Sequence, residues 1–195
     1  MLQAGDGHEK LTISYVGVGA NVTSSKGSLR LTLRRSIAEL ASDSVSISSI
    51  SSFFHSPAFP AGSGPDFLNA VVELSTDLSA NMLLHFLHEI EGEFGRVRDT
   101  RWSPRVLDLD LLAHGNEILP NLETLEHWQN LPLAAQMSES PSELILPHPR
   151  LQDRVFVLKP WAEIAPDWIH PATGISVRQM LANLPDEEKA STYPI

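Results

Sequence analysis

The sequence predicts an α+β fold of three α/β/α layers, a four-stranded antiparallel sheet with helices packed on it. Two observations lead to this fold class. Four segments in the first 114 residues have the alternation or the β-branched content of strands, and two segments with helical periodicity separate them. Their order is β-α-β-β-α-β, as in ferredoxin-like domains, and further helical segments follow it.

The first half of the chain contains three of the predicted strands and one helix. Residues 11–19, LTISYVGVG, are β-branched and apolar and end in glycine, which indicates a buried strand. Residues 28–41 carry Leu29, Leu33, Ile37, Leu40 and Ala41 on one stripe, which predicts a helix. Apolar residues alternate with serines over 44–54, and 67–76 is a further apolar strand segment. Between them, PAFPAGSGPD at 57–66 is typical of a loop.

The clearest predicted helix covers residues 79–94. Its core-facing stripe consists of Leu83, Leu87, Ile90 and Phe94. Ser79 can cap its first turn, and Gly95 can end it. A strand is expected at 106–114.

The second half of the chain is expected to be mostly helix and loop. Helices are expected at 154–164 and 175–184. Residues 120–146 are rich in proline and glutamate and lack lysine and arginine, so we interpret them as an insertion. It could form a short amphipathic helix through Leu122, Leu125 and Gln129, or stay mobile, and we expect Trp128 or Leu125 to pack on the domain.

Length and composition predict one soluble domain. A single domain at 11–185 is expected, with a flexible tail at 1–10 and a loose one at 186–195. The first ten residues lack the pattern of a signal peptide, and no apolar run approaches the roughly 18 residues of a membrane span. The formal charge of −10 argues against nucleic-acid binding, and the absence of cysteine fits a cytoplasmic protein. We expect a monomer that binds small molecules.

Arginines are concentrated in one segment of this acidic chain. Arg96, Arg98, Arg101 and Arg105 lie within ten residues and suggest a local anion site. The alternative is a solvated charged loop.

Two aspartates follow this segment with the spacing of a strand. Asp108 and Asp110 should point to one face, with Leu107, Leu109 and Leu111 on the other, and their α-carbons should lie about 6.6 Å apart. Carboxylates at that spacing can bridge two cations, and hard oxygen ligands favour magnesium. The alternative is an ordinary exposed strand face. Magnesium carboxylates beside arginines are the two halves of a polyphosphate site, although no P-loop motif occurs.

Several motifs of the sequence resemble those of a known family. The run RWSPRVLDLD at 101–110 resembles the signature of the 6-hydroxymethyl-7,8-dihydropterin pyrophosphokinases. Further similar motifs are YVGVGAN at 15–21, Ser56-Pro57, DFLNA at 66–70, Glu91, GRVR at 95–98, LPHPR at 146–150 and RVF at 154–156. The resemblance covers residues 12–184 apart from the insertion.

The resemblance implies an activity and a set of site residues. The activity is the transfer of diphosphate from ATP to the hydroxymethyl group of a dihydropterin, with release of AMP, on the route to folate. Two Mg²⁺ ions on Asp108 and Asp110 would bridge the phosphates and the pterin hydroxyl, and Arg96 and Arg105 would be catalytic phosphate contacts. The implied ATP-binding residues are His88, Glu91, Arg98, Trp102, His148 and Arg154. The implied pterin-binding residues are Ser56, Pro57, Phe67, Asn69 and Phe156.

Some of these residues also allow a purely structural interpretation. Phe67 and Phe156 could be core aromatics, Asn69 a strand-edge residue, His148 an ordinary loop histidine and Arg154 a helix cap. The sequence also departs from the family pattern, with Ser103 for glycine, His88 for glutamine, Ala58 for proline and Phe67 for tyrosine. None of these departures removes a metal ligand or a phosphate arginine.

Two other functions remain open from the sequence. A polymerase-β-type nucleotidyltransferase also uses a D-x-D pair, but its Gly-Ser helix start does not occur just before this pair. An inactive acidic ferredoxin-like module that docks a partner through 120–146 is the non-enzymatic alternative.

Overall fold

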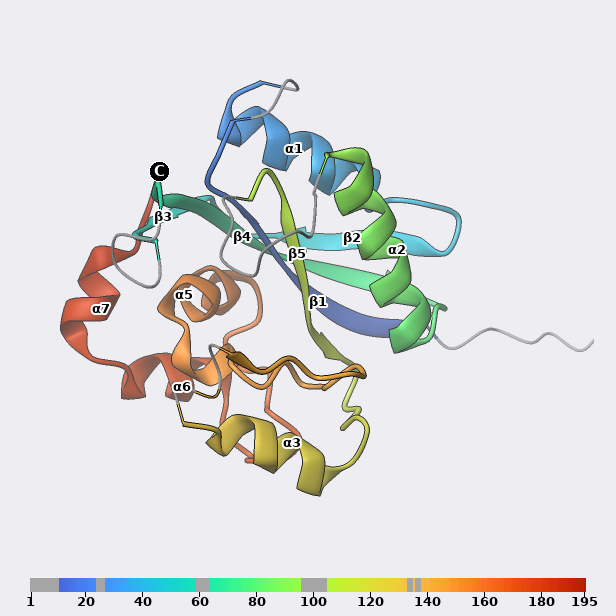
Figure 1. Cartoon of the computed structure of the whole chain (residues 1–195), viewed down its shortest axis with the longest axis vertical. Coiled ribbons are helices and arrows are strands. Elements are labelled where there is room, and N and C mark those ends of the chain that lie inside the picture. The colour runs from blue at the N-terminus through green and yellow to red at the C-terminus, as the bar shows by residue number, and fades with distance from the viewer. Residues whose placement is uncertain (1–10, 24–26, 59–63, 96–104, 133–134, 136–137) are drawn as a thin grey trace, which may run out of the picture.

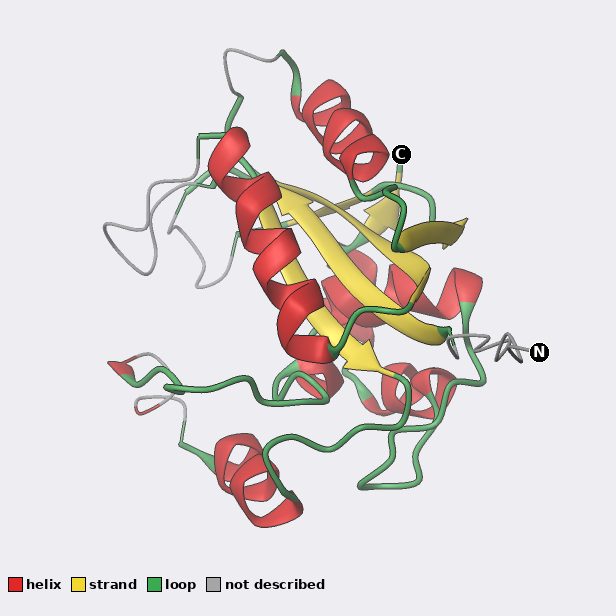
Figure 2. Cartoon of the chain, turned by 90° about the vertical axis from the view of Figure 1, so that its right-hand side faces the viewer, coloured by secondary structure: helices red, strands yellow, loops and turns green. Residues whose placement is uncertain are grey.

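A computed structural model describes residues 11–23, 27–58, 64–95, 105–132, 135 and 138–195. Its strands are β1 Thr12–Ala20, β2 Val45–Ile50, β3 Phe54–Ser56, β4 Phe67–Thr76, β5 Asp108–His114 and β6 Tyr193–Pro194. Its helices are α1 Leu29–Glu39, α2 Ala80–Glu93, α3 Leu122–Asn130, α5 Val155–Ile164, α6 Val177–Asn183 and α7 Asp186–Ser191, with a 3₁₀ turn at Leu151–Asp153. The predicted α+β class is confirmed (Figures 1 and 2). The order up to β5 is β-α-β-β-β-α-β, with one strand more between α1 and α2 than the predicted β-α-β-β-α-β.

The sheet is antiparallel and has the strand order β5-β1-β4-β3-β6, with β2 also paired to β4. It therefore has six strands rather than four. The difference arises because the strand expected at 44–54 is two strands, which pair with opposite halves of β4. β2 lies against Val72–Thr76 and β3 against Phe67–Asn69. This split leaves β3 beside the beginning of β4, at the end of the sheet where β5 also starts.

Helices cover both faces of the sheet and bury two separate cores. On one face, the stripes of α1 and α2 pack on β1 and β5, with Leu33, Leu83 and Leu109 at most 2 % exposed. On the other face lie α5 and α6 (Figure 1). They pack through Trp161 and Met180. The predicted stripe of α2 is buried throughout, and the Ser79 hydroxyl caps the Met82 N–H as expected. Ala41, assigned to the α1 stripe, is instead exposed because α1 ends before it.

The C-terminal residues 186–195 are ordered, contrary to the loose tail expected for them. They form α7 and then β6, which pairs with β3. The Lys159 ammonium donates to the Thr192 carbonyl at 2.7 Å, and the Ile195 N–H donates to the Phe53 carbonyl at 2.9 Å. The sequence did not indicate this because α7 buries no residue and β6 is too short for an alternation pattern. The expected tail at 1–10 lies outside the described residues.

The two ends of the insertion are held together at the surface of the domain. Backbone hydrogen bonds of 2.9 and 3.1 Å join Leu119 to Leu146 at its base. Of the two alternatives left open for this segment, the short amphipathic helix is present as α3, and of the two residues expected to pack on the domain, Leu125 is fully buried. Over the part of the chain described here, no helix is long and apolar enough to cross a membrane.

Candidate active site

The two aspartates lie at the start of β5, on the face of the sheet that α5 covers. Leu109 and Leu111 point into the opposite core, as the alternation predicted, while Asp108 and Asp110 stay partly exposed. Asp108 pairs with Gly19 of the neighbouring strand β1, and Asp110 pairs with Gly17. Because directly paired residues share a face, both carboxylates lie next to a position that has no side chain.

Gly19 lies between the predicted metal and pterin residues. Its partner on one side is Asp108 and on the other is Asn69 of β4. Neighbouring strands are about 4.8 Å apart, so Asp108 and Asn69 are about 9.6 Å apart across the glycine. A Cβ on Gly19 would lie only 3.2 Å from Asn69 Oδ1 and 3.9 Å from the Phe67 ring. The glycine therefore keeps an open strip of sheet between the aspartates and Asn69.

Both carboxylates have an arginine beside them. Arg105 Nη1 contacts Asp108 Oδ2, and Arg154 Nη1 lies 3.6 Å from Asp110 Oδ2. Burial by itself would lower the pKa of Arg105, but the charges of Asp108, Asp110 and Glu91 outweigh it and raise the pKa. Arg105 is therefore a permanent cation here, and its side chain is only 29 % exposed.

Asn21, a residue to which the sequence suggested no role in the site, holds Arg105 in place. Its Oδ1 accepts from the Arg105 N–H at 2.7 Å, and its own N–H donates to the Arg105 carbonyl at 3.0 Å. Its Nδ2 also donates to the Pro65 carbonyl at 3.1 Å. A single buried side chain thus connects the start of β5 to the segment that leads into β4.

His148 comes to the same end of the sheet from the C-terminal half of the chain. Its N–H donates to the Leu112 carbonyl at 2.8 Å, and its Nδ1 accepts from the Arg150 N–H at 3.1 Å. His148 is partly buried, and desolvation together with the charges of Arg154 and Arg150 lowers the pKa of its imidazole to about 3. The imidazole is therefore neutral, and because Nδ1 accepts, its proton lies on Nε2.

Glu91, an expected ATP contact, is only 1 % exposed. Its Oε1 accepts from the Leu109 N–H at 2.8 Å, so it joins α2 to β5 between the two aspartates. His88 lies one turn earlier on α2 and is partly buried.

The expected pterin residues are grouped around the β3–β4 pair. Asn69 Nδ2 donates to Ser56 Oγ at 2.9 Å, and both residues are buried. Ser56 pairs directly with Phe67, while Pro57 is exposed just beyond β3. Phe156, in the first turn of α5, is partly buried on the same face, with the Arg154 guanidinium 5.7 Å from its ring centre. Arg154 therefore lies between Asp110 and Phe156.

Three expected site residues cannot be placed. Arg96, Arg98 and Trp102 lie outside the described residues. Within the described ranges, no cluster of three or more histidine, cysteine or acidic side chains could hold a metal ion by itself.

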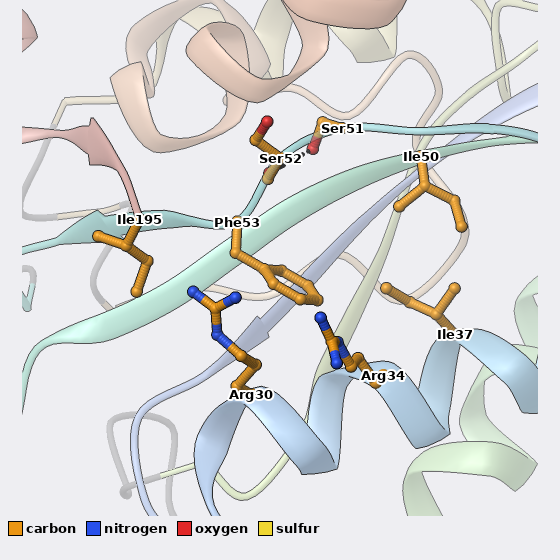
Figure 3. A pocket seen from close by; sticks show the side chains of 8 residues that line it. All are labelled: Arg30, Arg34, Ile37, Ile50, Ser51, Ser52, Phe53 and Ile195. Carbon is orange, nitrogen blue, oxygen red and sulfur yellow. Dashed lines mark hydrogen bonds between the residues drawn. The ribbon is translucent and has the colours of Figure 1, made fainter.

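A hollow of about 360 Å³ lies elsewhere, between α1 and the segment Ile50–Phe53 (Figure 3). Arg30 and Arg34 of α1 reach up beside the Phe53 ring, and the Arg30 Cζ is 5.6 Å from the ring centre. None of the expected site residues lines this hollow, and α1 covers the face of the sheet opposite the carboxylates. Its volume therefore does not mark the candidate active site.

The arrangement around β5 suits the binding and transfer of phosphate groups. It combines two carboxylates, two arginines and a neutral imidazole donor with aromatic and amide side chains on the same face of the sheet. Such a set can neutralise a polyphosphate and orient a polar ring next to it.

Comparison with known proteins shows what this chain is similar to. Residues 15–166 match the family model of 7,8-dihydro-6-hydroxymethylpterin-pyrophosphokinase. A 2-amino-4-hydroxy-6-hydroxymethyldihydropteridine pyrophosphokinase of Synechocystis sp. is 37 % identical over 169 residues, 86 % of this chain and 74 % of its own. The enzyme of the same name from Bacillus subtilis is 33 % identical over 168 residues, 86 % of each chain.

A solved structure supports the fold. The Plasmodium falciparum HPPK-DHPS wild type with STZ-DHP matches 93 % of this chain with a TM-score of 0.66 and 11 % identity. This chain spans 44 % of the length of that protein. At this identity the match shows a shared fold.

Proposed function

The chain belongs to the 7,8-dihydro-6-hydroxymethylpterin-pyrophosphokinase family, and we infer from its site how it performs the reaction of that family. It is an ATP-dependent diphosphotransferase that transfers diphosphate to 6-hydroxymethyl-7,8-dihydropterin and releases AMP in folate biosynthesis.

The row Asp108–Gly19–Asn69 is the observation that carries the proposed mechanism. If the polar edge of the pterin lies on Asn69, the ring would extend along the open strip over Gly19 toward the carboxylates. The distance from Asn69 to Asp108 is one that a two-ring molecule spans. The hydroxymethyl group would then lie beside Asp108 and Asp110, next to the β-phosphorus of ATP. Positioning of this kind provides much of the catalysis in phosphoryl transfer.

Asp108 and Asp110 fit magnesium that is held jointly with the nucleotide. Mg²⁺ keeps several waters and binds proteins through one or two carboxylates plus substrate phosphates. Two aspartates, with no third such ligand grouped with them among the described residues, match its needs. When bound, it would supply charge neutralisation at the phosphates and polarise the hydroxyl. We propose two ions per chain. Titration of Mn²⁺ with a non-hydrolysable ATP analogue should give that stoichiometry.

The remaining polar groups would hold the triphosphate. Arg105 and Arg154, which pair with Asp108 and Asp110, would bind phosphate oxygens when the two aspartates hold the metal. His148 would donate from Nε2 without adding a charge, and the N-terminus of α5 favours an anion nearby. Arg96, Arg98, Trp102 and His88 are further proposed nucleotide contacts. For Glu91 we now propose a positioning role, because its carboxylate holds the backbone of β5.

The pterin would lie between Phe67 and Phe156, with Asn69 and Ser56 at its polar edge and Pro57 at the rim. Aromatic faces on both sides would stabilise a flat ring and keep it aligned with the strip over Gly19.

Measurement of AMP formed with the hydroxymethylpterin, with and without Mg²⁺, tests the proposal. Asp110→Asn should lower turnover more than tenfold, which corresponds to an activation barrier higher by more than about 1.4 kcal/mol. Asp167→Asn, in an exposed ion pair with Arg178, is the matched control and should leave turnover unchanged. An Asp110→Asn variant with more than a tenth of wild-type turnover contradicts the metal assignment. Pyrophosphate release would indicate nucleotidyl transfer, and ATP binding without turnover would indicate a binding module.

We further propose that residues 11–185, together with α7 and β6, form one catalytic domain and that the enzyme is a cytoplasmic monomer without nucleic-acid or membrane partners. The net charge of −10 supports this because like-charged copies repel one another. Light scattering at assay concentration checks the monomeric state.

A further inference from the structure

A contact between two side chains joins the strand β3 to the residue that precedes β4. His55 Nε2 lies 3.0 Å from Asp66 Oδ2. His55 directly precedes Ser56, and Asp66 directly precedes Phe67. Because Ser56 and Phe67 are paired across the two strands, the contact lies immediately beside the proposed pterin slot.

The surroundings of His55 hold its ring in one orientation. The ring stacks on Tyr193 of β6 with 4.8 Å between centroids and 25° between planes. β6 itself pairs with β3, and the C-terminus lies beside β3 in Figure 1. Since carboxylate oxygens only accept, Nε2 is the donor to Asp66. The side chain of His55 is 29 % exposed, against 77 % for His85 in the surface pair His85–Glu89.

We propose that His55 and Asp66 act together as positioning residues that set the width of the pterin slot. The role rests on the function proposed above. Ser56 supports the Asn69 amide, and Phe67 supplies one face of the slot, so a shift of β3 against the start of β4 would misalign both. Neither His55 nor Asp66 need touch the substrate. β6 contributes by fixing the ring of His55.

The role predicts a selective effect on the pterin. His55→Ala and Asp66→Ala should each raise the KM for the pterin about fivefold, in line with the net contribution of one ordinary hydrogen bond. The KM for ATP should stay within twofold, because His55 and Asp66 pair with each other, whereas Arg105 and Arg154 pair with Asp108 and Asp110. His55→Gln, which keeps a donor close to the position of Nε2, should restore a nearly wild-type KM.

A double-mutant cycle separates this role from a general loss of stability. If the pair acts as a unit, the double variant should bind the pterin no more weakly than either single variant. The same cycle on His85 and Glu89, a pair of similar distance on the exposed face of α2, should leave both KM values unchanged.

The outcomes distinguish this inference from the proposed function. If the wild-type chain turns over the pterin but the single variants keep its KM, or shift the KM for ATP equally, the positioning role is wrong. Additive effects in the double variant would also overturn it. A wild-type chain without turnover would instead overturn the proposed function, and with it this role.

Discussion

Asn21 binds both backbone polar groups of Arg105, through Oδ1 at 2.7 Å and through its own N–H at 3.0 Å. This double contact joins the end of β1 to the residue that precedes the aspartate strand. It holds the backbone of Arg105 in place, and thereby helps to position the guanidinium beside Asp108.

Asn21→Ala should therefore impair catalysis while the fold survives. We expect kcat/KM for ATP to fall at least about tenfold, which corresponds to a loss of about 1.4 kcal/mol of transition-state stabilisation. Stability should fall by about 1 to 3 kcal/mol, since a buried N–H loses its acceptor. Steady-state kinetics and urea denaturation measure the two effects. Asn121→Ala removes a comparable side-chain acceptor at the cap of α3 and should leave kinetics unchanged. Equal kinetic losses in both variants would contradict the prediction.

Two glycines of β1 provide a matched pair. Gly19→Ala places a Cβ 3.2 Å from Asn69 Oδ1, so the amide must move and its hydrogen bond to Ser56 weakens. Gly17→Ala meets Leu112 and Asp110 only at 3.5 Å or more, an ordinary contact. We expect pterin affinity to fall about fivefold in the first variant and to change little in the second. Calorimetry with the pterin and the ATP analogue checks this, and equal losses in both variants would refute it.

Phe156→Ala should weaken pterin binding more than ATP binding. Loss of one aromatic face removes buried area plus about 0.5 to 1.5 kcal/mol of stacking, so the pterin Kd should rise more than tenfold. Arg154 keeps its contact with Asp110, which should preserve most of the ATP affinity. Calorimetry that shows ATP affinity falling as much as pterin affinity would identify Phe156 as a core residue.

Buried histidines should make stability depend on pH. His170 is 1 % exposed, and burial lowers its pKa below 6.5, as it does for His114 and His148. Below about pH 6.5, each of these histidines therefore binds a proton in the unfolded chain but not in the folded chain. The free energy of unfolding then falls as the pH falls, by up to about 1.4 kcal/mol per pH unit for each histidine. His170→Asn keeps an acceptor for the Ala172 N–H. Urea denaturation from pH 7 to 5 should show a smaller slope for this variant, and an unchanged slope would contradict the prediction.

Replacement of residues 121–142 by a short Gly-Ser linker should preserve the fold and the site. The Leu119–Leu146 hydrogen bonds already join the ends of the insertion, and loop length itself changes closure entropy little. Loss of the buried Leu125 should cost about 1.5 to 3 kcal/mol and lower the melting temperature. ATP affinity should stay within a few-fold. A folded variant that cannot bind ATP would make the insertion part of the site.

The sequence by itself determined the features that depend on local spacing. The alternation of leucine and aspartate over 107–111 predicted which side chains share a face, and the stripe of α2 predicted its buried residues. The order of the motifs identified the family.

Tertiary structure alone decided which distant residues meet. The position of Gly19 between Asp108 and Asn69 depends on the register of three strands, and the bond from Asn21 to Arg105 spans 84 positions of sequence. The division of 44–54 into two strands and the pairing of β6 with β3 likewise depend on neighbours far along the chain. Local periodicity shows which face of an element is buried, but not which element packs on that face. That choice depends on strand register and on side-chain packing between segments remote in sequence.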